Sequence, residues 1–348
     1  MDTKNLSAKI ENRFDELIEE ITKCLKESKS SKDYSFNKEK SVRDLEYILN
    51  YLAEAVYFDN DSLFKDFSIW LRSLFENIGL SDDVFLNTYH CIQKVIKANF
   101  EPEEINYLNN LIDLSIQKAL EENNREKSYL TEDNPHKHFA DKYLELLLDN
   151  KKSEASNLII DKALSEMSVP DIYLNILEPV QKEVGRLWHA NQISVAQEHY
   201  VSSVTQLVMS QLYSHFLSSG GEKGNIVTTA VGTELHEIGI RMVADLLEID
   251  GFDTIHLGAN TPPASIVETL KKNRTILLGI SVTLPIHLKK LAQLVDMIRS
   301  EPELDNIKIL VGGYAFNQNP ELKEKFDVDA YSVNAHNAVN KVNKLLEG

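Results

Sequence analysis

The residues best suited to chemistry stand close together in the sequence: Glu234, His236 and Gly239. A histidine with a carboxylate two residues before it is a plausible metal-ligand pair. The carboxylate can accept a hydrogen bond from one ring nitrogen, which fixes the tautomer and strengthens the other nitrogen as a metal donor. A nearby glycine lets a bulky group approach the backbone closely. This segment therefore predicts a bulky metal-containing ligand held through one imidazole.

The elements that must position this pair alternate between strand and helix from Asn225 onward. Five β-rich runs, separated by helix-length stretches, read NIVTTA, DTIHLG, TILLGISV, NIKILVGG and DAYSV. Such alternation predicts a doubly wound, flavodoxin-like parallel sheet, and ligands of these sheets bind beyond the carboxyl ends of the strands. Further candidate residues end the third and fourth strands: Ser281, Thr283, Gly312 and Gly313.

The rest of the chain is predicted to be helical. In Ser62–Ile78 the apolar residues follow the three-four spacing of one buried helix face, and Gly79 ends that helix. Further helices are expected near Ser41 and after Pro102. The predicted fold class is α + α/β with three domains, namely a helical domain at 1–122, a four-helix-bundle cap at 139–217 and the sheet domain at 225–348. A polar linker at 121–138 and the joint SSGGEKG at 218–224 separate them.

A short loop of the cap gathers Trp188, Glu198 and His199. The loop HANQI follows a helix that starts near Pro170 and is expected to kink at Pro179, and it precedes a helix capped by Ser194 with Gln197 in a capping box. Antiparallel helices joined by a short loop bring the last turn of one near the first turn of the next. The three side chains are therefore expected at one end of the bundle.

Composition excludes several classes of protein. The chain has 54 acidic against 37 basic residues and a formal charge of −17, which disfavours binding to nucleic acids and anionic membranes. No apolar run approaches the ~20 residues of a membrane span, and the N-terminal segment lacks the apolar stretch of a secretion signal. Cys24 and Cys91 lie far apart without a CxxC motif, which indicates two structural thiols in a reducing compartment. We expect a cytoplasmic protein that is not itself an enzyme.

The run ELHEIG at residues 234–239, followed by SVT and GG, resembles the fingerprint of base-off, His-on cobalamin domains. That family includes methionine synthase, corrinoid methyl-carrier proteins and some mutases. The resemblance implies that His236 displaces the cofactor's own base and ligates cobalt from below. It also implies a path for the nucleotide tail, past Gly239 and along Ser281, Thr283, Gly312 and Gly313. Two residues depart from the family pattern, Glu234 where Asp is commoner and Thr283 where Leu is common.

Trp188, followed after nine residues by Glu198 and His199, resembles the cap of cobalamin-dependent photoreceptors that repress carotenoid genes. In that family the tryptophan packs against the 5′-deoxyadenosyl group, the glutamate contacts its ribose, and the histidine can ligate cobalt after light removes the group. The resemblance covers about residues 140–348. It implies the same three roles here, with adenosylcobalamin as the cofactor.

The N-terminal domain departs from those repressors, which carry a winged helix-turn-helix. Cobalamin-binding antirepressors lack this DNA-binding domain. Photocobilins also lack it, and they hold a linear tetrapyrrole such as biliverdin. Tyr89, His90 and Cys91 could contact such a pigment, although core packing is the favoured role of Cys91. We expect a light-responsive sensor that acts through a regulatory protein or transcription factor, with a homo-oligomer as an option. The alternatives are a corrinoid methyl carrier of a methyltransferase system and a photocobilin-type photoreceptor.

Overall fold

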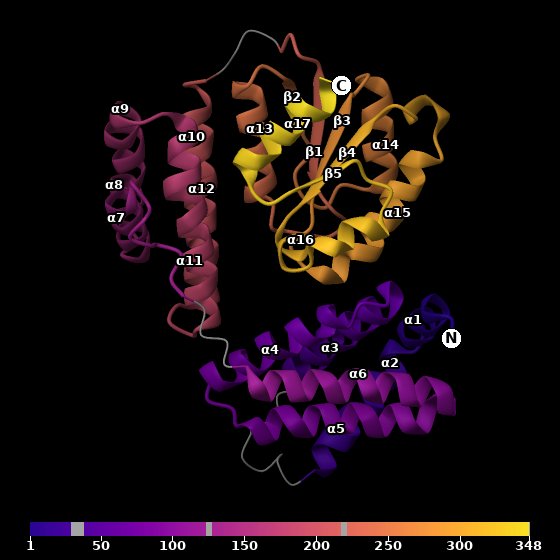
Figure 1. The fold of residues 1–348 in the computed structure, drawn as a ribbon. Helices are drawn as coiled ribbons and strands as arrows, with labels where there is room; N and C mark the ends of the chain where they lie inside the picture. Colours follow the sequence, from indigo (N-terminus) through magenta and orange to yellow (C-terminus); the bar gives the residue numbers. More distant parts are fainter. Residues whose placement is uncertain (29–37, 123–126, 217–220, 348) are drawn as a thin grey trace. The chain divides into compact units, whose positions relative to one another are not determined.

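The computed structural model describes residues 1–28, 38–122, 127–216 and 221–347 (Figure 1). Parts of the predicted linker and joint, residues 123–126 and 218–220, lie outside these ranges. The chain forms two compact units, Met1–Glu126 with His189–Asn191, and Lys127–Trp188 with Gln192–Gly348. The first unit is helical and the second combines helices with a parallel sheet, which confirms the predicted fold class. Among the described residues we find no helix whose length and apolarity would let it cross a bilayer.

Within its described residues the N-terminal unit contains six helices. They are α1 (Thr3–Glu11), α2 (Phe14–Glu27), α3 (Lys38–Phe58), α4 (Asp61–Asn77), α5 (Asp82–Asn99) and α6 (Pro102–Glu121). The helix predicted near Ser62 is α4, and Leu63, Phe64 and Phe67 on its apolar face are buried. Gly79 follows α4 with a φ of +82°, a conformation that glycine adopts without steric cost.

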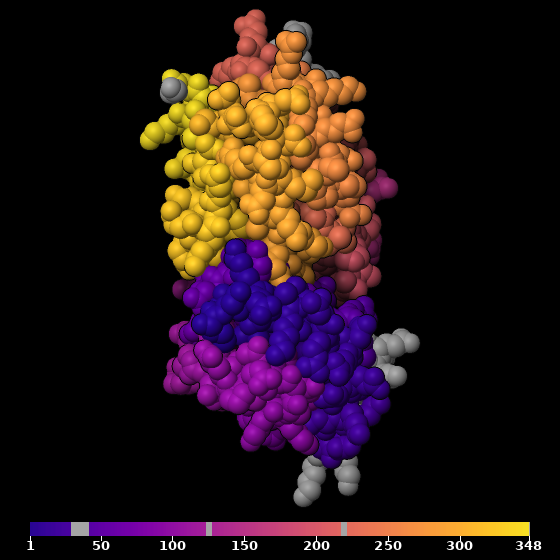
Figure 2. Space-filling view, turned by 90° about the vertical axis from the view of Figure 1, so that its right-hand side faces the viewer, coloured from indigo at the N-terminus to yellow at the C-terminus, as the bar shows by residue number. Residues whose placement is uncertain are grey.

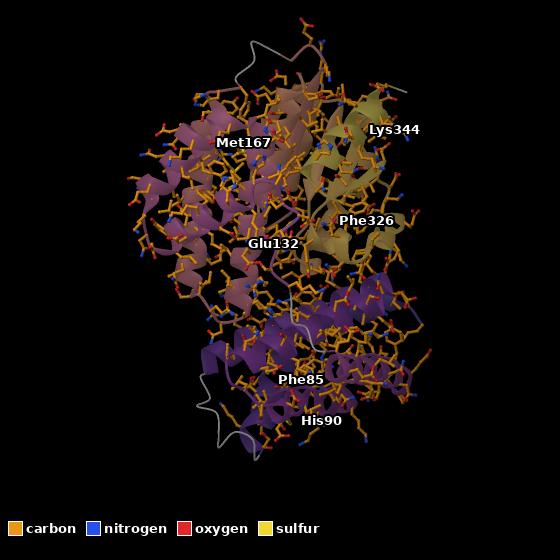
Figure 3. All side chains as sticks on the ribbon, turned by 60° about the vertical axis from the view of Figure 1, so that its left-hand side comes forward. Phe85, His90, Glu132, Met167, Phe326 and Lys344 are labelled. Atoms are coloured by element: carbon orange, nitrogen blue, oxygen red, sulfur yellow. A yellow bond between two sulfur atoms is a disulfide. The ribbon has the colours of Figure 1, made fainter. Side chains whose placement is uncertain are left out.

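The prediction of two free thiols is wrong, because Cys24 on α2 and Cys91 on α5 form a disulfide with their Cα atoms 5.8 Å apart. Cys91 does lie on the core face of α5, where it is buried together with Phe85. His90 on the same helix is exposed (Figure 3). The two cysteines are separated by 67 positions in the sequence, so the pairing depends on the packing of α2 against α5, which the sequence does not reveal.

The cap begins the second unit and consists of α-helices interrupted by two turns of π-helix. Its elements are α7 (Lys137–Leu148), α8 (Lys152–Asn157), η2 (Leu158–Ala163), α9 (Leu164–Glu166), α10 (Val169–Ile172), η3 (Tyr173–Leu177), α11 (Glu178–His189) and α12 (Val195–Tyr213). The irregularity expected at Pro179 is the π-helical turn η3 directly before α11. Pro179 has no N–H to donate to the Asn175 carbonyl oxygen. That oxygen instead accepts a hydrogen bond from Nδ2 of Asn134 at 2.7 Å. The predicted capping box of Ser194 and Gln197 is confirmed.

The sheet has five parallel strands in the order β2-β1-β3-β4-β5, which is the predicted doubly wound topology. The strands are β1 (Asn225–Ala230), β2 (Asp253–His256), β3 (Leu277–Ser281), β4 (Lys308–Gly312) and β5 (Ala330–Ser332). Their register aligns Ala230, Ser281, Gly312 and Ser332 in one row. The carboxyl ends of four strands therefore meet at one edge, where the candidate residues were predicted to gather.

Helices cover both faces of the sheet (Figure 1). One face carries α13 (Ile238–Ile249) and α17 (Ala335–Leu346), and the other carries α14 (Pro263–Lys272) and α15 (Leu288–Arg299). In Figure 2 the orange segment that includes α14 and α15 faces the viewer beside the yellow C-terminal segment. Short elements, η4 (Pro285–His287), η5 (Pro302–Leu304), α16 (Tyr314–Gln318) and η6 (Pro320–Lys325), complete the connections.

Candidate cofactor site

Glu234 is the centre of the loop between β1 and α13. The residue is only 1% exposed, and both of its carboxylate oxygens accept hydrogen bonds. Oε1 accepts the backbone N–H of His236 at 3.1 Å and also contacts Nδ1 of the same residue. Oε2 accepts the backbone N–H groups of Thr283 at 3.1 Å and Leu284 at 2.8 Å. The carboxylate therefore ties the loop after β1 to the loop after β3.

His236 presents its ring outward while Glu234 holds it from the buried side. The His236 side chain is 58% exposed. Because Nδ1 donates to the carboxylate, Nε2 keeps the free lone pair that a metal needs. The hydrogen bond to Glu234 raises the pKa of His236 against the effect of burial, and the charges of Glu234 and Glu198 add to the rise. The pair therefore makes Nε2 an electron-rich donor.

The same contacts keep Glu234 ionised. Burial on its own would raise the pKa of Glu234, but the hydrogen bond and charge of His236 and the backbone N–H of Leu284 lower it below its usual range. Hydrogen bonds to the charged form of a carboxyl group favour that form. The buried residue at this position is therefore a carboxylate that accepts four N–H groups.

The three candidate glycines have different surroundings. A Cβ on Gly239, in the first turn of α13, would meet no atom within 4 Å. A Cβ on Gly312 would lie 3.0 Å from the Ser332 carbonyl oxygen, and one on Gly313 only 2.4 Å from that of Val282, with φ at +100°. Backbone packing thus explains glycine at 312 and 313, whereas open space lies at Gly239. Their predicted part in binding a nucleotide tail stays a prediction.

The loop after β3 brings a second histidine to this edge. Ser281 is the last residue of β3 and is buried, and Thr283 contributes its backbone N–H to Glu234. His287 is 7% exposed, and its Nδ1 has no hydrogen-bond partner. Burial lowers the pKa of His287. The negative charge of Glu234 opposes this shift, and the positive charges of Lys290 and His236 add to it.

On the cap, Glu198 and His199 contact each other near the start of α12. The Glu198 carboxylate touches Nδ1 of His199, and its other oxygen accepts the Ser202 hydroxyl at 3.0 Å. The charge of Glu198 contributes to the raised pKa of His236. Trp188, at the end of α11, is partly buried against the apolar core of the cap. The predicted roles of these cap residues toward an upper ligand stay predictions.

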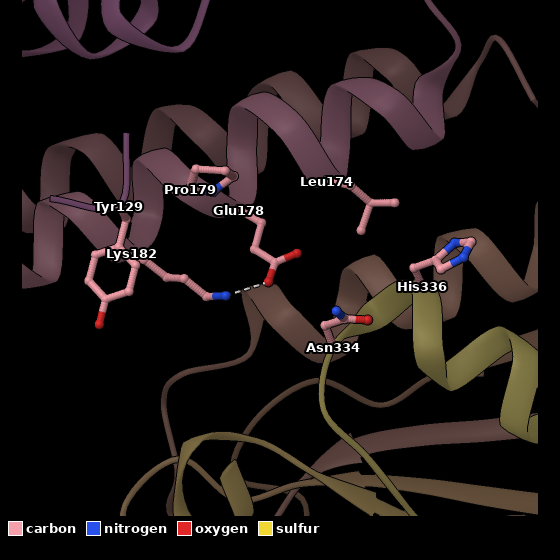
Figure 4. Close-up of a pocket in the computed structure, with 7 residues that line it drawn as sticks. All are labelled: Tyr129, Leu174, Glu178, Pro179, Lys182, Asn334 and His336. Atoms are coloured by element: carbon pink, nitrogen blue, oxygen red, sulfur yellow. Dashed lines mark hydrogen bonds and ion pairs between the residues drawn. The ribbon is translucent and has the colours of Figure 1, made fainter. Parts of the chain in front are cut away.

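A separate hollow of about 360 Å³ lies between the cap and the loop that leads into α17 (Figure 4). The lining residues are Tyr129, Leu174, Glu178, Pro179, Lys182, Asn334 and His336. Glu178 and Lys182 form an ion pair at 2.6 Å across one turn of α11. As far as the chain is described, the lining includes none of the residues predicted to hold the cofactor.

The sequence did not predict a part for Leu284 or His287, nor for Asp245, whose Oδ2 accepts the Tyr173 hydroxyl at 2.7 Å. The part of Leu284 is a backbone N–H, which no side-chain pattern reveals. The position of His287, shortly after Ser281 and Thr283, was only weak evidence that it lies at the site. Asp245 carried a clearer signal, because it stands among the apolar residues of MVADLL, on the face of α13 that is buried.

Comparison with known proteins identifies the class of ligand. Residues 224–339 match the model of the B12 binding domain, and residues 140–213 match a second model that is also described as a B12 binding domain. Dimethylamine corrinoid protein 1 of Methanosarcina mazei is 25% identical over 199 residues, which cover 57% of this chain and 91% of that protein. Trimethylamine corrinoid protein of Methanosarcina barkeri is 30% identical over 122 residues, which cover 34% of this chain and 55% of that protein.

A solved structure supports the same assignment of fold. The monomethylamine corrinoid protein of Methanosarcina barkeri superimposes with a TM-score of 0.54 and 22% identity, covering 60% of this chain and 99% of that one. At this level of identity the likeness shows that the cap and the sheet domain share its fold.

These relatives contradict the expected light-responsive regulator. They are named as corrinoid proteins of methylamines, which is the class of the alternative, a corrinoid methyl carrier. The part of the predicted resemblance that pointed to photoreceptors and antirepressors has no support from them. The part that pointed to cobalamin does, since residues 140–213 and 224–339 belong to the B12-binding domain family and the chain is a cobalamin-binding protein.

Proposed function

We propose that this protein is a corrinoid methyl carrier that holds its cofactor base-off through Nε2 of His236 and serves partner methyltransferases. The observation that carries the proposal is the hydrogen bond between the buried Glu234 carboxylate and Nδ1 of His236. The similarity to methylamine corrinoid proteins supports the choice of a carrier. When bound, the corrinoid cobalt would supply the centre that accepts and releases a methyl group.

The donor set suits a corrinoid. A bound corrinoid would take one nitrogen donor from the protein, and His236 would supply it. His236 offers one exposed imidazole in a tautomer fixed by Glu234. The open space at Gly239 leaves room beside that ring for a bulky group. Glu234 would keep the imidazole oriented whether or not the cobalt bears an upper ligand.

A carrier needs an upper side that partner proteins can reach. The cap supplies Glu198, whose charge acts on His236, and the partly buried Trp188 at the end of α11. We propose that these residues exclude water from the upper side between transfers. The adenosyl upper ligand expected from the sequence stays a prediction, as does the bilin of the photocobilin alternative, and a methyl carrier requires neither.

The methyl donor follows by analogy. The relatives are named for mono-, di- and trimethylamine, so we propose a methylated amine or a similar small methyl donor. The chain would carry the group, and separate partner enzymes would catalyse its transfer on and off. This replaces the predicted regulatory partner or transcription factor with methyltransferase partners.

The test loads the purified chain with isotope-labelled methylcobalamin and adds a thiol together with a thiol methyltransferase from a methylamine system. We expect the bound methyl group to reach the thiol faster than it does from free methylcobalamin, and His236→Ala to abolish the advantage. A rate no higher than that of the free cofactor would contradict the carrier function. Repeating the assay in darkness and in light checks that transfer does not depend on illumination.

A further inference from the structure

The cap rests on the sheet domain along a row of polar contacts to α13. Gln206 Nε2 donates to Glu237 Oε1 at 3.1 Å, and Arg241 donates to the Ser210 hydroxyl at 2.9 Å. The Tyr213 hydroxyl donates to Glu248 at 2.7 Å. A fourth contact comes from the π-helical turn η3, where the Tyr173 hydroxyl donates to Asp245 Oδ2 at 2.7 Å. We call this set of four contacts the α13 seam.

The spacing of these residues shows that the seam is one continuous surface. On α13 and its N-cap the residues stand four, four and three positions apart, at 237, 241, 245 and 248. On α12 they stand four and three apart, at 206, 210 and 213. Residues three and four positions apart share one face of a helix. The two helices lie side by side and run in the same direction (Figure 1).

Tyr173 and Asp245 form the buried contact of the seam. Tyr173 is 0% exposed and Asp245 is 6% exposed, whereas the other seam residues are only partly buried or exposed. Burial raises the pKa of Asp245 to about 6. The hydrogen bond from Tyr173 and the charge of Arg241 act against this rise, and the charge of Glu248 adds to it. If a buried carboxyl group loses its hydrogen-bond donor, the free energy lost when it was removed from water is no longer offset.

Apolar residues also join the cap to the sheet domain. Met242 and Leu246 of α13 are buried in the apolar core of the cap, and Ile238 and Val243 of the same helix pack against that core. Polar groups can exchange their protein partners for water when two surfaces part, so a polar seam separates at a lower cost than an apolar one. The hydrogen bonds of the seam are therefore the part of this interface that water can replace when the cap moves.

We propose that the α13 seam is a latch, fastened mainly by the Tyr173–Asp245 hydrogen bond, that sets how often the cap lifts to expose the upper side of the bound cofactor. The inference rests on the proposed carrier function, since a carrier must let reagents reach cobalt from above. The contact between Gln206 and Glu237 extends the latch to the loop after β1, because Glu237 directly follows His236. The Oε2 atom of Glu237 also accepts the backbone N–H of Ala259 at 2.8 Å.

The test measures access to the upper side directly. Full-length protein is loaded with aquacobalamin, and the rate at which cyanide replaces the upper ligand is followed by absorbance. Tyr173→Phe removes the buried hydroxyl of the latch and should raise this rate about tenfold, equivalent to about 1.4 kcal/mol less stabilisation of the closed cap. Tyr213→Phe, at the less buried contact with Glu248, should raise it about threefold.

Tyr143→Phe is the matched control. Tyr143 is as buried as Tyr173, but its hydroxyl bonds Thr205 at 3.3 Å inside the cap and does not reach α13. Its cyanide rate should equal that of the wild type. Equal rates for the wild type and both Tyr173→Phe and Tyr213→Phe would overturn the latch, and so would an equal rise in Tyr143→Phe.

The two proposals fail in different ways. Failure of the wild type to retain any corrinoid through gel filtration would contradict the carrier function itself. Retention of the corrinoid with unchanged cyanide rates in the variants would leave the carrier function standing and remove the latch. If Tyr173→Phe does not fold, Tyr213→Phe alone decides, because its side chain is only partly buried.

Discussion

The Glu234 carboxylate joins His236 to the backbone of Thr283 and Leu284, and so links two loops that are 49 residues apart in the chain. A ligand held by His236 is therefore held by two strands of the sheet. This arrangement makes the position of the imidazole depend on a single buried acid.

Glu234→Gln should weaken corrinoid binding by about 10–100-fold, the usual loss when the hydrogen-bond partner of a ligating histidine is changed. A neutral amide cannot accept every N–H group that surrounds Glu234, because its nitrogen is a donor. Titration of the protein with aquacobalamin measures the affinity. Glu198→Gln, which changes an acid of the cap, is the control and should bind from below with nearly the affinity of the wild type.

Gly239→Ala and Gly313→Ala should have opposite effects. Alanine at 239 fits open space in a helix and should leave the free energy of unfolding equal or about 0.5–1 kcal/mol higher, but it narrows the approach beside His236 and should weaken corrinoid binding. Alanine at 313 meets the Val282 carbonyl at 2.4 Å at a positive φ and should destabilise the fold by more than about 1 kcal/mol. Chemical denaturation and cofactor titration separate the two. A Gly239→Ala protein with unaltered affinity would remove this glycine from the site.

Reduction of the Cys24–Cys91 disulfide should destabilise the N-terminal unit. A cross-link across 67 residues removes about 4 kcal/mol of chain entropy from the unfolded state in the usual model. Denaturant curves of the protein with and without dithiothreitol measure this loss, and Cys24→Ser with Cys91→Ser should match the reduced wild type. If oxidised and reduced protein unfold at the same denaturant concentration, the bond contributes nothing to stability.

Asp245→Asn should gain stability relative to the wild type as the pH rises from about 4 to 6. Burial raises the pKa of Asp245 from 3.8 to about 6, so the folded state binds a proton more tightly than the unfolded state and the wild type loses stability over this interval. Asparagine has no such charge and still accepts the Tyr173 hydroxyl. The difference in the free energy of unfolding should reach about 2–3 kcal/mol above pH 6 and then stay constant. A difference that does not vary with pH would show that folding does not raise the pKa of Asp245.

Much of the sheet domain could be predicted because its signals are local. Strand and helix alternate at regular intervals, and parallel topology brings the strand ends, with His236, Ser281 and Gly312, to one edge. The Cys24–Cys91 bond could not be predicted, because it depends on how α2 packs against α5. Nor could the Tyr173–Asp245 contact, because it joins the cap to α13 across 72 residues. The prediction of a photoreceptor was wrong for a different reason. It rested on only three residues of the cap, and families with different functions share one cobalamin-binding fold.

The coordination of cobalt by His236 is tested most directly by electron paramagnetic resonance of the protein loaded with cobalamin and reduced to the Co(II) state. We predict that each cobalt line splits into three through a single axial nitrogen. Protein with ¹⁵N-labelled histidine should give two lines instead of three, which separates His236 from the cofactor's own base. His236→Ala should lose the histidine splitting, whereas His199→Ala should keep it. A triplet that persists in the ¹⁵N-histidine protein, or a histidine splitting that survives His236→Ala, would contradict the account.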